Sequence, residues 1–364
     1  MFVFLINFIS SVNGGGAEIL VRELHKRFKQ KGFTAKAIYF TGSAEGLDQD
    51  EFVLGLNPRS PLNILRIRCL LKKYLDETGE DLKVHVHLTW PFFYVTLASF
   101  GLRNVALFYT EHSTSNKRRK IPLFRYFERI FYSRFSWIIC ISGGVENSLS
   151  RWVGSSLSKR LVTIPNGSRI YPLTQRLPLS GRKPHLVSIG SLTYRKNFVT
   201  VLRALGQVRD CFETFTLVGE GPERSALENI ILQEQLEGKV QLVGWSDEIQ
   251  EYLNAADIQL IPSLWEGFGL VAVEGMSTGL PVVASNVDGL REVLDPNNLS
   301  VTLVDEPESV EAWVHAINAC ISKLEEQGQA TLAQFSRTQA EQFTLESMAN
   351  NYLHVYRESP PLSS

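Results

Sequence analysis

Cysteine is scarce in this sequence, and the long apolar runs of membrane-spanning segments are absent. The four cysteines, Cys69, Cys140, Cys211 and Cys320, are scattered without any CxxC pair. Their spacing argues against a disulfide framework or a zinc site and is typical of a reducing, cytoplasmic compartment. No stretch of about 20 apolar residues occurs, so no segment is expected to span a bilayer. The net charge of −1 favours no class of partner, and nucleic-acid binding is not expected without a domain-wide basic excess.

The amino terminus begins with an apolar run that could be mistaken for a signal peptide. Residues 1–11 have no Lys or Arg ahead of the apolar residues, and the turn Gly14–Gly16 follows at once. A signal peptide needs a basic segment before its apolar core. We therefore interpret residues 1–9 as a first buried strand.

The chain of 364 residues is longer than one typical hydrophobic core and predicts two domains. Short apolar runs alternate with amphipathic segments, which indicates βαβ units and parallel sheets. Residues 170–183 are rich in Pro, Ser, Arg and Gly and show no periodicity. We expect an N-terminal domain over residues 1–170 and a C-terminal domain over residues 171–340. Residues 341–364 are expected to form a helix and a tail that return to the N-terminal domain.

Two carboxylates, Glu266 and Glu274, flank a predicted strand-to-helix turn. A predicted strand over residues 258–262 ends just before Glu266, and a helix is expected to begin near residues 268–270. Gly267 and Gly269 would let a ligand approach the backbone, and the free N–H groups of the helix start favour a phosphate. Each carboxylate can hold a pair of sugar or ribose hydroxyls. The plainer alternative is one exposed Glu and one Glu that merely stabilises a helix start.

The segment from Glu266 to Glu274 resembles the Glu-x7-Glu signature of glycosyltransferase family 4. Other segments resemble the family in the same order along the chain: residues 140–142, 164–167, 187–197, 217–223, 240–244, 255–257 and 279–285. The resemblance covers nearly the whole chain and is strongest over residues 185–294. It implies an α/β fold of the GT-B type, in which two Rossmann-like domains face each other across a cleft. It also implies a nucleotide sugar in the C-terminal domain, an acceptor in the N-terminal domain and retention of anomeric configuration.

The resemblance also assigns roles to individual residues of the donor site. Lys196 corresponds to a phosphate-binding lysine, but Ser191 stands where the family often has an arginine, so Arg195 is expected to supply the second cation. The glycine turn after the first strand would bring its backbone close to the donor diphosphate. The expected donor-binding residues are Gly15, Gly16, Ser191, Arg195, Lys196, Gly244, Glu266, Gly267, Phe268, Gly269, Leu270 and Glu274.

His112 follows a predicted strand over residues 105–109 and resembles a histidine of the family's N-terminal domain. This similarity implies contact with the transferred sugar, although a lone histidine is more often structural or exposed. We count His112, Lys196 and Glu266 as the catalytic candidates, and Glu111 as a weaker one. His85 and His87 alternate along a predicted strand and so face one side of it; lining of the cleft is one interpretation, and an ordinary structural role is the other. No cysteine or carboxylate cluster supports metal binding by these two histidines.

Lys117, Arg118, Arg119 and Lys120 form a basic cluster ahead of an aromatic-rich segment over residues 121–135. Interleaved basic and aromatic residues favour docking on an anionic membrane surface. A plain core-facing helix is the main alternative, because Phe124, Phe127, Phe131 and Phe135 share one helical face. Nucleic acid is a weaker alternative.

These observations predict an enzyme that moves a sugar from a UDP- or GDP-sugar to a glycan or lipid-linked glycan in cell-surface polysaccharide assembly. No cofactor or metal is expected, because the sequence has no Asp-x-Asp motif in a loop of the right kind. Localisation would be cytoplasmic, with peripheral attachment to the inner face of the membrane. Two alternatives stay open: an epimerase or hydrolase that acts on the nucleotide sugar itself, and a non-catalytic binding subunit.

Overall fold

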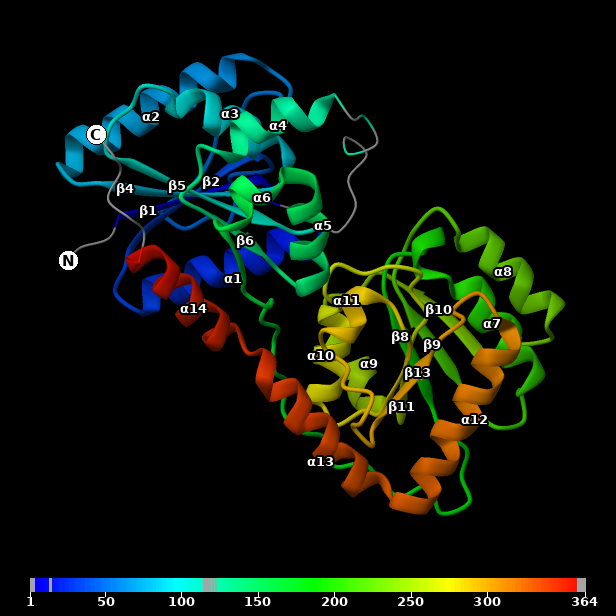
Figure 1. Ribbon diagram of the computed structural model, residues 1–364. Helices are drawn as coiled ribbons and strands as arrows, with labels where there is room; N and C mark the ends of the chain where they lie inside the picture. Colours follow the sequence, from blue (N-terminus) through cyan, green and yellow to red (C-terminus); the bar gives the residue numbers. More distant parts are fainter. Residues whose placement is uncertain (1–3, 13–14, 114–118, 120, 122, 359–364) are drawn as a thin grey trace. The chain divides into compact units, whose positions relative to one another are not determined.

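The computed structural model describes residues 4–12, 15–113, 119, 121 and 123–358, and the chain forms two compact units (Figure 1). Unit 1 consists of Met1–Gly167 together with Leu345–Ser364, and unit 2 consists of Ser168–Thr344. The division falls between Gly167 and Ser168, whereas the sequence predicted a boundary at residue 170. None of the helices in the described part of the chain combines the length and the apolar character needed to cross a bilayer.

The described part of unit 1 contains a parallel sheet of seven strands in the order β3-β2-β1-β4-β5-β6-β7. The strands are β1 (Phe4–Ser11), β2 (Thr34–Thr41), β3 (Glu51–Val53), β4 (Leu82–His87), β5 (Val105–Glu111), β6 (Trp137–Cys140) and β7 (Leu161–Thr163). The helices between them are α1 (Gly16–Gln30), α2 (Leu62–Thr78), α3 (Thr89–Ser99), α4 (Phe124–Tyr132), α5 (Gly143–Val153) and α6 (Ser155–Ser158). The central strands are almost fully buried, as expected for a parallel sheet covered on both faces.

Unit 2 repeats this architecture with six parallel strands in the order β10-β9-β8-β11-β12-β13. The strands are β8 (Leu186–Ile189), β9 (Phe215–Val218), β10 (Val240–Gly244), β11 (Ile258–Ile261), β12 (Val282–Ser285) and β13 (Val301–Val304). The helical elements are η2 (Tyr194–Lys196), α7 (Phe198–Gln207), α8 (Arg224–Gln233), α9 (Ile249–Ala255), α10 (Leu270–Ser277), α11 (Asp288–Arg291), α12 (Val310–Gln327), α13 (Gln329–Ala340) and η3 (Glu341–Phe343). The main hydrophobic core of unit 2 lies between its sheet and the helices α7, α8 and α12.

The last helix, α14 (Leu345–Arg357), is part of unit 1 although it follows unit 2 in the sequence. It packs beside α1, and the two helices share one hydrophobic core with the sheet (Figure 1). The rings of Phe28 and Tyr356 meet at 5.9 Å, and Lys31 forms an ion pair with Glu346. The sequence predicted this helix from the helical spacing of Leu345 and the apolar residues that follow it.

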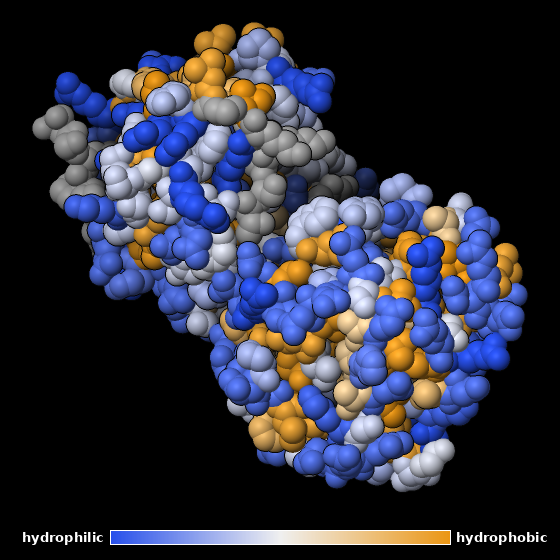
Figure 2. All heavy atoms as spheres, turned by 45° about the vertical axis from the view of Figure 1, so that its right-hand side comes forward, coloured by the Kyte–Doolittle hydropathy of each residue, from blue (hydrophilic) through white to orange (hydrophobic). Residues whose placement is uncertain are grey.

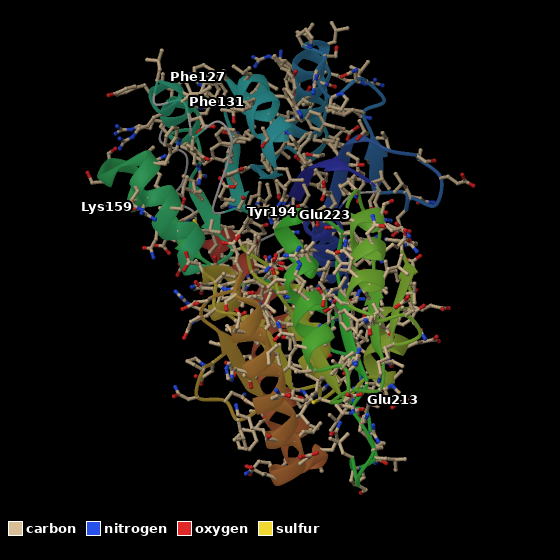
Figure 3. All side chains as sticks on the ribbon, turned by 90° about the vertical axis from the view of Figure 1, so that its right-hand side faces the viewer. Phe127, Phe131, Lys159, Tyr194, Glu213 and Glu223 are labelled. Atoms are coloured by element: carbon tan, nitrogen blue, oxygen red, sulfur yellow. The ribbon has the colours of Figure 1, made fainter. Side chains whose placement is uncertain are left out.

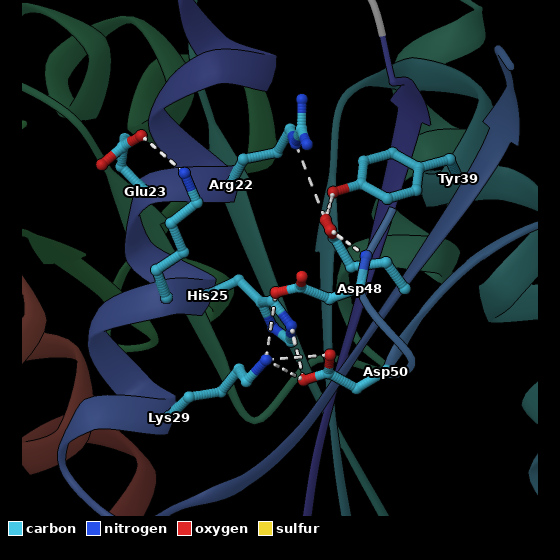
Figure 4. A network of polar contacts seen from close by, with 9 residues as sticks. Arg22, Glu23, His25, Lys29, Tyr39, Asp48 and Asp50 are labelled. Atoms are coloured by element: carbon cyan, nitrogen blue, oxygen red, sulfur yellow. Dashed lines mark hydrogen bonds and ion pairs between the residues drawn. The ribbon is translucent and has the colours of Figure 1, made fainter. Parts of the chain in front are cut away.

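A polar network ties α1 to the segment that leads into β3 (Figure 4). Lys29 Nζ donates to Asp48 Oδ2 at 3.2 Å and to Asp50 Oδ1 at 2.9 Å. Tyr39 Oη donates to Glu51 Oε1 at 2.5 Å. Asp48 and Asp50 make up an Asp-x-Asp sequence, but it precedes β3 and therefore lies toward the amino-terminal edge of the sheet. Both carboxylates are bound to a lysine there.

The order of the strands reverses once in each sheet. In unit 1 the chain moves outward from β1 to β2 and β3, and then returns to β4 on the other side of β1. In unit 2 the same reversal separates β8 from β11. Parallel α/β sheets bind ligands outside the carboxyl ends of the two strands at this switch point. The two switch points are therefore the places where a binding site is expected.

Candidate functional site

A cluster of charged side chains lies at the switch point of unit 2. Arg195 and Lys196 belong to η2, which follows β8, whereas Glu266 belongs to the loop that follows β11. Because β8 and β11 are neighbours, the segments that follow their carboxyl ends meet. The amide of Leu264 donates to the carbonyl of Arg195 at 2.8 Å and joins the two loops directly. The structure thus brings the neighbours Arg195 and Lys196 next to Glu266, which lies about 70 positions later in the sequence.

Glu266 binds both cations through separate oxygen atoms. Lys196 Nζ donates to Glu266 Oε1 at 2.5 Å, and Arg195 Nη1 donates to Oε2 at 2.8 Å. Ser263 Oγ donates to Oε1 at 2.8 Å. Ser263 was not among the expected site residues, although it lies between the predicted strand over residues 258–262 and Glu266. The carboxylate therefore accepts a charge-assisted hydrogen bond on each oxygen, which is the strong kind.

The electrostatics of Glu266 follow from these contacts. Burial raises the pKa of its carboxyl group, but Lys196 and Arg195 outweigh this effect and bring the pKa below its ordinary value. Lys196 is itself 8% exposed. A buried lysine needs a counter-charge, because desolvation of an unpaired ammonium is costly. Glu266 is that counter-charge in this structure.

The loop after Glu266 has the conformation that the glycines in the sequence predicted. Gly269 has φ +92°, a value that favours glycine, and it immediately precedes α10. Phe268 is buried and packs edge-on against Phe343, so its backbone rather than its side chain is available to a ligand. Gly267 and Leu270 lie in the same turn at the start of α10. The free N–H groups at this helix start suit an anion.

Glu274 lies in the second turn of α10, as predicted. No hydrogen bond to its carboxylate is found among the described residues. Burial raises the pKa of Glu274 to about 7, although Arg169 lowers it. The sequence analysis missed Arg169, which lies in the segment that enters unit 2. A carboxylate without a hydrogen-bond partner among the described residues retains both oxygens for hydroxyl groups of a ligand.

Ser191 and Gly244 lie at the carboxyl ends of β8 and β10. Ser191 is exposed and directly follows the turn at Gly190. Gly244 has φ +83° and accepts a hydrogen bond of 2.8 Å from the amide of Gly219. Neither residue contacts the Glu266 cluster among the described interactions, so the two mark the edge of the site rather than its centre. Exposed Tyr194 and Trp265 flank the cluster, with their rings 6.3 Å apart.

His112 lies at the corresponding edge of unit 1, directly after β5. His87 Nδ1 lies 3.3 Å from His112 Nε2, so one ring donates a hydrogen bond and the other accepts it. Burial lowers the pKa of His112 to about 4, and burial also lowers the pKa of His87 well below its ordinary value. Both imidazoles are therefore neutral at neutral pH. The contact between His87 and His112 was not predicted, because it depends on β4 and β5 being neighbours in the sheet.

The structure favours the structural interpretation of His85 over cleft lining. His85 is completely buried beneath α14, where its Nδ1 bonds Tyr356 Oη and its Nε2 lies 2.8 Å from Thr110 Oγ1. Its partner Tyr356 is 271 positions away, so no local pattern could have indicated the burial. His87 is also buried. Among the described residues, no group of three or more His, Cys, Asp or Glu side chains is placed to hold a metal ion.

Glu111 and Arg119 also differ from their expected roles. Arg119 Nη2 donates to Glu111 Oε2 at 2.5 Å, and Tyr132 Oη contacts the same oxygen at 3.4 Å. The side chains of Arg119 and Glu111 are 10% and 5% exposed. Arg119 is therefore the counter-ion of a buried carboxylate and does not face a membrane. Lys117, Arg118 and Lys120 lie outside the described residues.

The glycine turn before α1 is described from Gly15 onward, and Gly14 lies outside the described residues. Gly15 precedes α1 in an extended conformation, and Gly16 is its first residue. Burial raises the pKa of Glu18 in the first turn, although hydrogen bonds from the backbones of Glu18 and Gly15 lower it. The start of α1 therefore already holds one carboxylate of the protein itself.

Two family models match consecutive parts of the chain. The model described as glycosyl transferases group 1 matches residues 173–334, and the model described as Glycosyltransferase Family 4 matches residues 14–168. The chain is 26% identical over 292 residues to an uncharacterized glycosyltransferase of Methanocaldococcus jannaschii, covering 79% of this chain and 78% of the relative. It is 26% identical over 237 residues to the lipopolysaccharide core biosynthesis glycosyltransferase LpsE of Rhizobium meliloti, covering 63% and 66%.

Solved structures show the same fold. A glycosyltransferase from Rickettsia africae matches with a TM-score of 0.83 at 20% identity, covering 100% of each chain. Anabaena HepE, whose crystal structure is a complex with UDP-glucose, matches with a TM-score of 0.79 at 20% identity, covering 97% of this chain and 99% of HepE. The two parallel α/β sheets of this chain therefore form the GT-B fold that the sequence predicted.

Proposed function

Because the chain belongs to the group 1 glycosyltransferases of glycosyltransferase family 4, we propose that it moves a sugar from a nucleotide sugar to a glycan hydroxyl with retention of anomeric configuration. The observation that carries the proposal is the cluster of Arg195, Lys196 and Glu266 at the switch point of unit 2. Arg195 and Lys196 lie beside the start of α10, which follows Gly267 and Gly269. Two cations next to such a helix start suit a diphosphate.

The chemical step places negative charge on the leaving nucleoside diphosphate. Lys196 and Arg195 would stabilise this charge, together with the backbone amides at the start of α10. The reacting sugar becomes oxocarbenium-like as its bond to the phosphate breaks. In the family mechanism the acceptor oxygen bonds to the same face of the sugar, and its proton passes to the leaving phosphate. No side-chain nucleophile is needed, and neutral His112 contacts the transferred sugar.

The donor is proposed to be a UDP- or GDP-sugar. HepE was crystallised with UDP-glucose, which supports a uridine donor for this chain. Glu274 would hold a pair of donor hydroxyls, because its carboxylate has no hydrogen-bond partner among the described residues. Gly15, Gly16, Ser191 and Gly244 would complete the donor site through their backbones. No metal is assigned to the reaction, because Arg195 and Lys196 supply the positive charge that a cation would otherwise provide.

The acceptor is proposed to be a glycan or lipid-linked glycan of a cell-surface polysaccharide. The similarity to LpsE, a lipopolysaccharide core glycosyltransferase, supports this class. A lipid-linked acceptor would be met at the cytoplasmic face of a membrane. We therefore retain docking of unit 1 on an anionic bilayer as part of the proposal, with Lys117, Arg118 and Lys120 as basic contributors and without Arg119.

The proposal is tested by turnover with and without an acceptor. The protein is incubated in EDTA with UDP- or GDP-sugars labelled in the sugar, and with lipid-linked glycans extracted from bacterial membranes. We expect release of the nucleoside diphosphate only when acceptor is present, with the label moving to the glycan. Release at the same rate without acceptor would identify a hydrolase and would contradict the proposal.

Glu274→Ala tests the donor site separately. Loss of a charged hydrogen bond costs about 1.5–3 kcal/mol, so donor binding should weaken roughly 10- to 100-fold. Calorimetric titration of the donor measures the change. Glu237→Ala is the matched control, because Glu237 is an exposed carboxylate in a loop of the same unit. Unchanged donor affinity in a folded Glu274→Ala protein would remove Glu274 from the site.

A further inference from the structure

A cavity of about 350 Å³ opens at the carboxyl edge of the unit 1 sheet. Ser10 at the end of β1 and Thr41 at the end of β2 form its floor, and Trp90 at the start of α3 forms one wall. Asn57 and Arg59, from the loop between β3 and α2, form another wall. The volume lies within the range of small-molecule sites, roughly 300–1,000 Å³. Every lining residue belongs to unit 1.

The cavity lies at the switch point of the sheet. Its floor is contributed by β1, and Trp90 follows β4, the strand on the other side of the reversal. Unit 2 has its Lys196–Glu266 cluster at the equivalent position. His112 follows β5, the neighbour of β4, so the cavity and His112 share one edge of the same sheet. This is the position where an α/β sheet of this topology holds a ligand.

Arg59 gives the cavity a positive charge that no carboxylate of the described residues neutralises. Among the described residues, Arg59 has no carboxylate partner, and its side chain is exposed. The nearest acidic residues in the sequence are engaged elsewhere. Glu51 accepts a hydrogen bond from Tyr39 and pairs with Arg22, and Asp48 and Asp50 are both bound to Lys29 (Figure 4). The guanidinium carbon of Arg59 lies 6.0 Å from the ring centre of Trp90, which in turn stacks on Tyr94. An aromatic platform of this kind orients a guanidinium and leaves its N–H groups for an anion.

The loop that carries Arg59 is held in place by its own hydrogen bonds. Asn57 Oδ1 accepts from the amide of Arg59 at 2.9 Å. The carbonyl of Asn57 accepts at 2.9 Å from Nδ2 of Asn63, a completely buried residue at the start of α2. Between the ends of β2 and β1, Thr41 Oγ1 donates to the carbonyl of Ser10 at 3.1 Å. The walls are therefore fixed before any ligand arrives, which lowers the entropy cost of binding.

We propose that this cavity is an acceptor subsite that binds an anionic group of the glycan, either the carboxylate of a uronic acid or a sugar phosphate. The inference rests on the proposed glycosyltransferase function and specifies the acceptor class. Arg59 pairs with the anionic group in a planar, two-pronged contact. The hydroxyl groups of Ser10 and Thr41 and the amide of Asn57 hydrogen-bond the ring hydroxyls. The bound anion orients the acceptor along the edge that also carries His112.

Saturation-transfer NMR with two matched pairs of probes tests the subsite. The pairs are methyl glucuronide with methyl glucoside, and glucose 1-phosphate with glucose. Saturating UDP is present throughout, so that the phosphate site of unit 2 is filled. We expect at least one anionic probe to bind about tenfold more tightly than its neutral counterpart. The pair that shows the difference identifies the group as a carboxylate or a phosphate.

Variants connect this binding to the cavity. Arg59→Gln should abolish the preference for the anionic probe, and Trp90→Ala should weaken it. Arg103→Gln is the control, because Arg103 is an exposed arginine that precedes β5 at the opposite edge of the sheet. Equal binding of anionic and neutral probes, or a preference that survives Arg59→Gln, would overturn the subsite. Calorimetry with UDP and GDP on the same proteins is independent of this result, so a wild type that binds neither nucleotide would count against the proposed function instead.

Discussion

Glu266 forms ion pairs with Lys196 and Arg195, the two residues that we propose bind the donor diphosphate. Its oxygens lie 2.5 Å from Lys196 Nζ and 2.8 Å from Arg195 Nη1. The same N–H groups cannot point fully at both a carboxylate and a phosphate. Glu266 must therefore yield at least part of its contacts when a donor binds. If the released carboxylate of Glu266 then binds sugar hydroxyls, this residue links donor binding to the placement of the sugar.

This competition predicts an unusual gain of affinity. Glu266→Gln removes the charge that neutralises Lys196 and Arg195, so we expect UDP alone to bind roughly 3- to 10-fold more tightly, a gain of about 1 kcal/mol. Sugar transfer should fall in the same variant, because the hydroxyl contacts lose a charged acceptor. Calorimetry with UDP and turnover with the UDP-sugar measure the two effects.

Glu237→Gln, which changes an exposed carboxylate in the same unit, should alter neither measurement. Weaker or unchanged UDP binding by Glu266→Gln would show that the carboxylate supports the phosphate site instead of competing for it.

At the scale of elements, α4 has two different faces. Phe131 and Tyr132 are buried against α3, and Glu128 is completely buried, where it accepts a hydrogen bond of 2.7 Å from Trp152 Nε1. The opposite face exposes Tyr126 and Ile130, which are 67% and 60% accessible. Phe127 is partly exposed but packs on the α3 side, against Phe93 and Phe131. Figure 3 shows Phe127 and Phe131 on this helix, and Figure 2 shows hydrophobic surface on the upper side of unit 1. The core-facing interpretation of residues 121–135 is therefore correct for only half of the helix.

The exposed face of α4 predicts membrane binding by shallow apolar insertion. We expect the wild type to co-sediment at low salt with vesicles that contain phosphatidylglycerol, but not with purely zwitterionic vesicles. Each nearby cation adds about 1 kcal/mol on the anionic surface, and exposed Arg134 follows the helix directly. The double variant Tyr126→Ser with Ile130→Ser should lose most of this binding and keep its affinity for UDP.

Leu232→Ser provides the control for this measurement, because Leu232 is a 58% exposed apolar residue on α8 of unit 2. Wild-type protein that ignores anionic vesicles at low salt would end the membrane proposal. The exposed face of α4 would then be ordinary surface.

The strand-and-helix alternation, the glycine turn at Gly269 and the convergence of Lys196 with Glu266 at one sheet edge could be predicted from the sequence. The first two features depend on local patterns and on the general rule for parallel sheets, whereas Lys196 was placed in the donor site with Glu266 through the resemblance to the family. The helix α3 could not be predicted, because Thr89–Ser99 is apolar on all sides and has no helical period. The burial of His85 and the inward turn of Arg119 also escaped prediction. Each depends on a partner that only the folded sheet brings near, α14 for His85 and the carboxylate of Glu111 for Arg119.

At the scale of the whole molecule, unit 1 is built from both ends of the chain. The helix α14 contributes Leu345, Met348, Tyr352 and Tyr356 to the same core as Leu20 and the other apolar residues of α1. Tyr352 is completely buried and lies within 3.1 Å of Thr110 Oγ1 on β5. The carboxyl-terminal helix is thus as much a part of the unit 1 core as its first strands.

Removal of one aromatic side chain from α14 should destabilise unit 1 alone. Truncation of a buried aromatic residue to alanine costs about 3–5 kcal/mol, so Tyr352→Ala should lower the free energy of unfolding of unit 1 by that amount. Hydrogen exchange followed by mass spectrometry resolves the two units, and amides of β1 and β5 should lose protection.

His354→Ala on the same helix is the control, since the side chain of His354 is 69% exposed. Amides of unit 2 and the affinity for UDP should not change in either variant. An equal loss of protection in both units would show that the two unfold together.

The position of α14 also determines the order of events during synthesis on the ribosome. Domains generally fold as units while the chain emerges, the amino-terminal one first. Here the segments that begin unit 1 emerge first, but the helix that covers one side of their core is translated only after all of unit 2. Unit 2 can complete its own core earlier. The nascent amino-terminal half must therefore wait with exposed apolar surface on α1 and β5 until the final helix is released, and during that interval it is a natural client for chaperones.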